Sequence, residues 1–209
     1  MSDETETRDR ILDAARTAFL RHGTSGARMQ EIADAADVNK ALLHYYFRTK
    51  DRLAEAVFTR EARRLLPPVL ETLGSEMALD EKVRRVVELY LEVLPEAPGL
   101  PAYVMAEMHY HPERLPAFVE SLTGATPQAH GTRVRRQLDA QIAAEVEAGR
   151  IRPIATEQFM ANLISLCIFP FAARPMLQLM MGHREGDFEA FVEDRRERLA
   201  DFFLRSLRP

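Results

Sequence analysis

The chain contains very little cysteine and no long hydrophobic run. Cys167 is the only cysteine among 209 residues, which excludes an intramolecular disulfide and favours a cytoplasmic setting. The longest apolar stretch, residues 163–173, is too short to span a bilayer and contains a proline. The N-terminus is polar and acidic, unlike a secretory signal. We therefore expect no association with a membrane.

The sequence also lacks the short motifs of common catalytic and cofactor sites. It contains no glycine-rich phosphate loop, no GxSxG, no HExxH and no CxxC. It shows no strand-type alternation, no hairpin signal and no internal repeat. These absences argue against an enzyme, and we expect no catalytic residue, no metal and no cofactor.

Neither sign of charge dominates the chain, but the two signs are unevenly distributed. The whole sequence has a net charge of -4. Residues 1–64 hold 12 Lys and Arg against 11 Asp and Glu, and three of those acids lie in the first six residues. The remainder holds 16 basic and 21 acidic residues. The N-terminal part, without its acidic tail, is therefore the end expected to face nucleic acid.

The apolar residues recur with helical periodicity along the whole chain, which predicts an all-α fold. Within the first 65 residues we expect a helix that ends near Gly23, two short helices, and a long helix capped by Asp51. Pro67 and Pro68 should break or kink this long helix. The expected helices span about residues 8–22, 28–36, 40–47 and 51–66, then 80–94, 101–110, 116–122, 127–148, 156–171 and 186–207.

The stretch from Arg28 to Lys50 carries the most specific pattern, that of a helix-turn-helix. Ala33 is small where the two helices approach each other. Asp37 lies where the turn needs a positive φ, which Asp adopts more readily than most residues. Val38 fills the turn, Asn39 is a good N-cap for the next helix, and Leu43 packs back toward Ala33.

The run IADAADVNKALLHYYFRTKDRL resembles the DNA-binding signature of the tetracycline-repressor (TetR) family of transcriptional regulators. The resemblance covers about residues 8–58 and includes the Tyr-Tyr-Phe group followed by Lys50. Beyond residue 60 only length and helical pattern agree. The sequence departs from the family pattern at Asp37, where glycine is usual, and at Arg28, where Thr or Ser is frequent.

The resemblance implies a three-helix DNA-binding domain over residues 1–52, joined by a long helix to a larger helical bundle over residues 53–209. The second domain would bind a small molecule and dimerise. Because the N-terminal residues of a recognition helix meet base edges, Lys40, Ala41 and Leu42 are expected to contact bases. Phosphate or base contact is expected from the remaining candidates. These are Arg28, Gln30, His44, Tyr45, Tyr46 and Lys50.

Residues 103–111 contain aromatic, methionine and histidine side chains in the region where the resemblance implies an effector pocket. The alternative, a metal site at Glu107, His109 and His111, is less favoured because a two-residue spacing suits a strand rather than a helix. Each of these residues could also belong simply to the core. The candidate pocket residues are Tyr103, Met105, Met108, His109 and Tyr110.

The resemblance therefore implies a repressor that binds a palindromic operator as a homodimer and is released by a small-molecule effector. The helices at 156–171 and 186–207 carry more apolar surface than a lone layer can hide, so we expect them to form the dimer interface. Two alternatives stay open. One is an activator or a regulator without an inducer, and the other is a helical-bundle enzyme or carrier.

Overall fold

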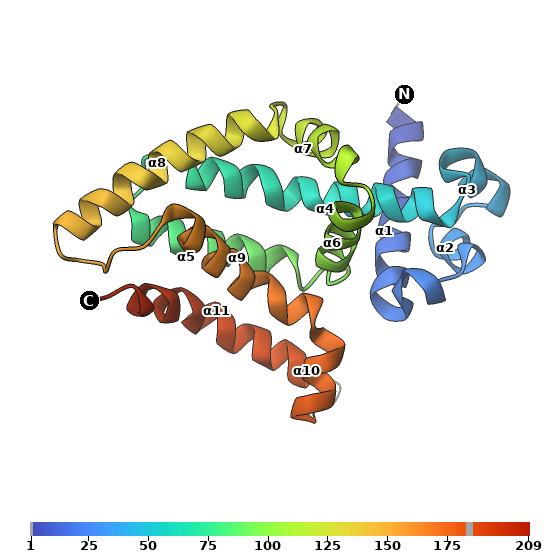
Figure 1. Cartoon of the computed structure of the whole chain (residues 1–209). Coiled ribbons are helices and arrows are strands. Elements are labelled where there is room, and N and C mark those ends of the chain that lie inside the picture. The colour runs from blue at the N-terminus through green and yellow to red at the C-terminus, as the bar shows by residue number, and fades with distance from the viewer. Residues whose placement is uncertain (1, 183–185) are drawn as a thin grey trace.

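The computed structural model describes residues 2–182 and 186–209, and within them every regular element is helical (Figure 1). The predicted fold class is confirmed: a small N-terminal group of helices is joined by one long helix to a larger helical bundle. The elements are α1 (Ser2–Gly26), α2 (Met29–Ala35), α3 (Lys40–Phe47), α4 (Lys50–Leu73), α5 (Leu79–Val93), α6 (Leu100–Tyr110), the 3-10 turn η1 (Pro112–Arg114), α7 (Leu115–Thr123), α8 (Pro127–Glu147), α9 (Thr156–Ala172), α10 (Arg174–Met181) and α11 (Asp187–Ser206).

The N-terminal helices form one small core around fully buried apolar side chains. Ile11, Leu12 and Ala15 of α1 meet Ile32 of α2 and Leu43 of α3, all at or near zero exposure. The first helix of the chain is interrupted at Gly23, where the sequence predicts its end, because this residue adopts a φ of 65°; a short helical piece follows to Gly26. Glycine tolerates that backbone geometry without a steric penalty.

The helix α4 links the two parts of the molecule and differs from expectation at both ends (Figure 1). Its N-cap is Thr49, whose Oγ1 accepts from the Arg52 amide at 3.2 Å, so the prediction that Asp51 caps this helix is wrong. The predicted break at Pro67 and Pro68 is wrong too, because the helix continues to Leu73. The prolines leave the carbonyls four residues earlier without amide donors, but those residues are exposed and water can satisfy them.

The C-terminal bundle places α5 at its centre, with α4, α9 and α11 packed against it. The faces of α5 bury Val83, Val86 and Leu91 completely or almost so. Edge-to-face ring contacts join α9 to α11 at Phe159 with Phe203 and at Phe171 with Phe188. The short helix α10, between α9 and α11, was not expected from the sequence.

The helices α9 and α10 together have the length and apolar composition of a membrane span, although neither has them alone. Among the described residues no single helix is long and apolar enough to cross a membrane, whereas α9 and α10 pass jointly with a bend of 71° between them.

Candidate nucleic-acid interface and ligand cavity

The turn between α2 and α3 has the backbone geometry that the sequence predicts. Asp37 adopts a φ of 52°, and its amide donates to the Asp34 carbonyl at 3.2 Å. The Val38 amide donates to the Ala33 carbonyl at 3.0 Å. This bond closes the turn at the position of the small alanine side chain. Asn39 caps α3, since its side chain accepts from the Leu42 amide at 2.7 Å. These bonds fix the angle between α2 and α3.

The helix α3 buries one face and presents the other to solvent. Leu43 and Phe47 are 0% and 5% exposed and belong to the core. The opposite face consists of Lys40, Ala41, His44 and Tyr45, which are exposed, with Leu42 partly buried beside them. Lys40 has no hydrogen-bond or ion-pair partner among the described residues, so its ammonium is available for an external acceptor.

His44 and Tyr45 differ in how firmly they are held. The His44 Nδ1 lies 2.9 Å from the Arg48 carbonyl oxygen, so Nδ1 carries the proton and donates, and Nε2 is left for another contact. Tyr45 is 72% exposed and makes an edge-to-face contact with the Tyr46 ring, at a centroid distance of 5.5 Å. A large aromatic ring that is so open to solvent is available to a partner.

Tyr46 and Lys50 contribute to the domain's own structure. The Tyr46 hydroxyl donates to the Glu4 carbonyl at 3.4 Å, and its ring packs partly against the core. The Lys50 Nζ donates to the Ser25 carbonyl at 2.8 Å and to the Ala27 carbonyl at 3.3 Å. Lys50 thus ties the start of α4 to the end of α1 and to the residue that follows it, and one of its three N–H donors is left over for a phosphate.

The two candidates on α2 lie on its exposed side. Arg28 occupies the N-cap position, makes no side-chain capping bond and has no partner among the described residues. The Gln30 Nε2 donates to Asp34 Oδ1 at 2.7 Å, which orients its amide along the helix. Arg48, which the sequence suggests is a solvated residue or one paired with an acidic neighbour, is exposed at the end of α3 and adopts a φ of 55°. No periodicity or motif signals this residue, since its position depends on the turn into α4.

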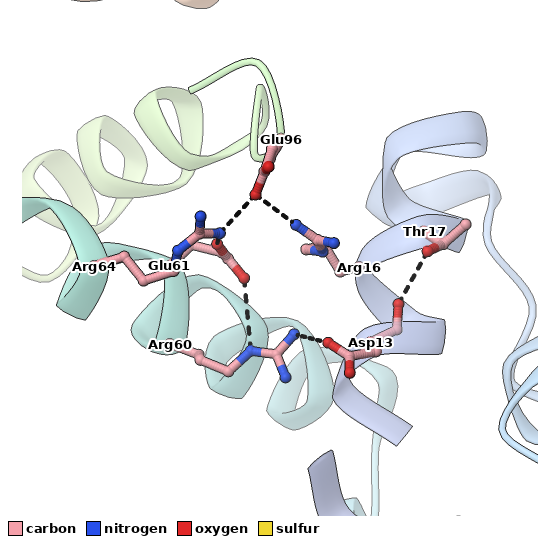
Figure 2. Close-up of polar contacts among 7 residues, drawn as sticks. All are labelled: Asp13, Arg16, Thr17, Arg60, Glu61, Arg64 and Glu96. Carbon is pink, nitrogen blue, oxygen red and sulfur yellow. Dashed lines mark hydrogen bonds and ion pairs between the residues drawn. The ribbon is translucent and has the colours of Figure 1, made fainter. Parts of the chain in front are cut away.

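An ion-pair network joins α1 to the bundle (Figure 2). Glu96, in the loop between α5 and α6, accepts from Arg16 of α1 at 3.0 Å and from Arg64 of α4 at 2.8 Å. Arg64 also pairs with Glu61 at 2.7 Å, and Arg60 reaches Asp13 of α1 at 2.8 Å. Figure 2 shows these side chains converging from three segments that lie far apart in the sequence.

The network shifts the pKa values of Glu96 and Arg64. Hydrogen bonds from Arg64 and Arg16 lower the pKa of the Glu96 carboxyl, and the Glu96 carboxylate in turn raises the pKa of Arg64. Glu61 is only 1% exposed, so its charge depends on Arg60 and Arg64 for compensation. The charges therefore favour the arrangement that holds α1, α4 and the α5–α6 loop together.

An apolar cavity of about 490 Å³ lies in the bundle between α4, α5, α6, α7 and α9. Its wall is formed almost wholly by aliphatic, methionine and phenylalanine side chains, with Tyr90 and Ser165 as the polar residues among those described. Met105, Met108 and Phe169 line it and are 59%, 50% and 54% exposed, so they border its opening. This is the size and lining of a small-molecule site.

The structure brings only part of the predicted pocket together. Met105 and Met108 line the cavity. Tyr103 lies outside it and stacks on Phe58 of α4, with ring centroids 4.5 Å apart. His109 and Tyr110 are exposed and also lie outside it. The reason is helical phase: the side of α6 that meets the cavity carries residues 101, 104, 105 and 108, and the other residues point elsewhere.

The family model described as bacterial regulatory proteins, tetR family, matches residues 11–57, which span α1 to the first part of α4. The chain is 26% identical over 199 residues to the HTH-type transcriptional regulator RutR of Escherichia coli, covering 95% of this chain and 89% of RutR. It is 32% identical over 91 residues to the probable HTH-type transcriptional regulator YttP of Bacillus subtilis, and this match spans 44% of each chain.

Solved structures share the fold along the whole chain. HlyIIR, a hemolysin II transcriptional regulator, superposes with a TM-score of 0.51 at 21% identity and 99% coverage of both chains. A TetR family transcription regulator from Marinobacter aquaeolei gives 0.51 at 20% identity, with 96% of each chain covered. The N-terminal match and the alignment with RutR support a transcriptional regulator with a tetR-type DNA-binding domain, and the solved structures share its fold along the whole chain.

Proposed function

We propose that this regulator is a repressor that binds a palindromic operator as a homodimer and releases it when a small molecule occupies the cavity in its bundle. The observation that carries the proposal is the outer face of α3. Lys40, Ala41, His44 and Tyr45 are exposed on a helix whose other face is locked into the domain core. Such a face can enter a major groove without rearrangement of the domain.

A palindromic operator requires a two-fold partner, and the C-terminal helices supply a suitable surface. Phe169 of α9 and Phe202 of α11 are 54% and 58% exposed in a single chain. On the neighbouring α10, Leu179 and Met180 are 84% and 75% exposed. Apolar side chains grouped in this way favour burial against a second copy. Paired recognition helices would then meet successive major grooves, about 34–36 Å apart.

The helix α4 and the ion-pair network supply a route from the cavity to the DNA-binding helices. Ala62, Leu65 and Leu66 of α4 line the cavity, and the same helix begins at Lys50 beside α1. Glu96 lies in the loop that leads into α6, which forms another wall of the cavity. A ligand that binds one arrangement of α4 and α6 better than another shifts the balance between them by that difference in affinity.

The proposal is tested by selecting bound duplexes from a random library with the full-length protein, and then measuring affinity for the selected duplex. A repressor of this kind selects an inverted repeat, binds it as a dimer and loses affinity steeply as salt rises. Selection of a direct repeat or of a single half-site would contradict the dimeric arrangement. The absence of any salt-dependent binding would contradict the assignment of α3 as the recognition helix.

A further inference from the structure

The cavity in the bundle has a lining that discriminates among ligands by charge. Among the described residues that line it, none carries a formal charge at neutral pH. The wall is built from side chains such as Leu66, Val104, Phe118, Ile164 and Ile168. An ion placed there would lose its hydration without gaining a counter-ion, and this costs far more than the burial of a neutral molecule.

Tyr90 is the principal polar group of this wall. It extends from α5, is 6% exposed and lines the cavity. Its hydroxyl makes no hydrogen bond to another described residue, and it is not among the fully enclosed polar atoms that lack a partner, so it is accessible to a ligand in the cavity. Burial raises the pKa of Tyr90 above its usual value, so the phenol stays protonated and able to donate at physiological pH.

We propose that the effector of this regulator is an uncharged, mainly apolar small molecule whose single strong hydrogen-bond acceptor is bound by the Tyr90 hydroxyl. The inference rests on the proposed function, in which this cavity is the effector site. A phenol is a better donor than an aliphatic hydroxyl, so a carbonyl oxygen suits it best. Ser165 on α9 offers a second, weaker hydroxyl on the same wall.

The ligand class is tested by competition against a neutral fluorescent probe, N-phenyl-1-naphthylamine, bound to the full-length protein. Three competitors of similar size differ in charge: 2-decanone is neutral, decanoate is an anion and decylammonium is a cation. We expect 2-decanone to displace the probe at a concentration at least about tenfold below that of either ion. Displacement by either ion at an equal or lower concentration, or none by the ketone, would overturn the proposal.

The role of Tyr90 is tested by Tyr90→Phe, which removes the hydroxyl and keeps the ring. Loss of one hydrogen bond should weaken 2-decanone binding by about three- to tenfold while probe binding changes little. The matched control is Tyr103→Phe, since Tyr103 lies outside the cavity. Thermal melting of both variants checks that they fold. Equal ketone affinity in Tyr90→Phe and wild type would overturn the assignment of Tyr90.

The same ligands separate the ligand class from the proposed function. With the selected duplex, the proposed function predicts that saturating 2-decanone lowers DNA affinity. If 2-decanone binds through Tyr90 and DNA affinity stays unchanged, the ligand class stands and release by an effector fails. If decanoate or decylammonium displaces the probe better and also releases the duplex, release stands and the uncharged class fails.

Discussion

At the residue scale, the helix-turn-helix shows how much a sequence can predict. The roles of Asp37 and Asn39 follow from local sterics and capping, and the structure confirms both, with a positive φ at the first and a capping bond at the second. The contacts of Lys50 could not be predicted, because its acceptors are carbonyls more than twenty residues earlier in the chain. Residues that bond across the fold leave no local signal.

Lys40 and Lys50 should therefore respond differently to removal of their charge. Lys40 is unengaged on the outer face of α3, so Lys40→Ala should relax base preference at one position of each half-site, by about 1–3 kcal/mol, and leave the fold intact. Lys50→Ala should weaken binding to all duplexes and also lower the unfolding temperature, since it loses two internal bonds. Repeating the duplex selection and the melts with each variant checks this. Unaltered base preference in Lys40→Ala would contradict its place at the bases.

Lys82 is a second residue that sequence reasoning missed. It is 0% exposed on α5, and its Nζ donates to the Leu73 carbonyl at the end of α4, at 2.9 Å. Burial lowers its pKa to about 8 from 10.5. Helical periodicity places this lysine on the core side of α5. The pattern cannot decide whether its side chain is buried or extends so that its ammonium reaches solvent.

The Lys82 pKa shift predicts a pH dependence of stability. Between about pH 8 and 10.5 the unfolded chain binds the proton more tightly than the folded chain, so this group makes stability rise with pH. Burial of Cys167 raises its pKa from 9.0 to about 12. Above pH 9 this thiol therefore makes stability fall with pH, opposite to the effect of Lys82. Chemical denaturation of wild type and Lys82→Met at several pH values isolates the lysine. The free energy of unfolding of wild type minus that of Lys82→Met should increase between about pH 8 and 10.5. A difference that stays constant with pH would contradict the predicted role of Lys82.

At the element scale, the helices with a clear apolar period were predictable. The short helix α10 and the continuation of α4 through its two prolines were not. The extents of α3, α6 and α9 agree with expectation to within a residue or two, because each carries a clear apolar stripe or run. The helix α10 is short and follows α9 after a sharp bend, so it has too few turns to show a period. The survival of α4 through Pro67 and Pro68 depends on the exposure of the preceding turn, which only the tertiary structure shows.

The network around Glu96 should hold α1 against α4 and the α5–α6 loop. Glu96→Gln keeps the shape of the side chain and removes its charge, so two charge-assisted bonds weaken. Because these groups are partly exposed, the loss should be about 1 kcal/mol or less, which speeds hydrogen exchange of α1 by roughly two- to fivefold. The control is Glu88→Gln, which removes the charge that pairs with Arg85 within α5. Equal exchange of α1 in both variants would show that the network does not restrain it.

At the scale of the whole molecule, the exposed aromatic and aliphatic surface on α9, α10 and α11 should be covered by a second copy. Phe202→Glu places a charge in the expected interface and should shift the protein toward monomers in sedimentation experiments at micromolar concentration. Tyr110→Glu is the control, because Tyr110 is 72% exposed at the end of α6 and does not belong to those three helices. If Phe202→Glu sediments like wild type, the dimer forms elsewhere.

The cavity belongs to this scale too, because its lining follows from the packing of helices rather than from local sequence. Its wall draws on five helices, and only the phase of α6 decides that Met105 and Met108 face it while Tyr103 does not. Composition can suggest that a stretch lines a cavity. The set of side chains that meet there depends on how the helices are packed.

The junction at Glu96 also affects how any DNA titration of this protein should be interpreted. Salt screens the contacts of Arg16 and Arg64 with Glu96 just as it screens contacts with phosphate. Part of the measured salt slope would then report loosening of the protein itself and would inflate the apparent number of phosphates contacted. The slope measured with Glu96→Gln lacks most of that contribution, so the difference between the two slopes gives the share that belongs to the protein.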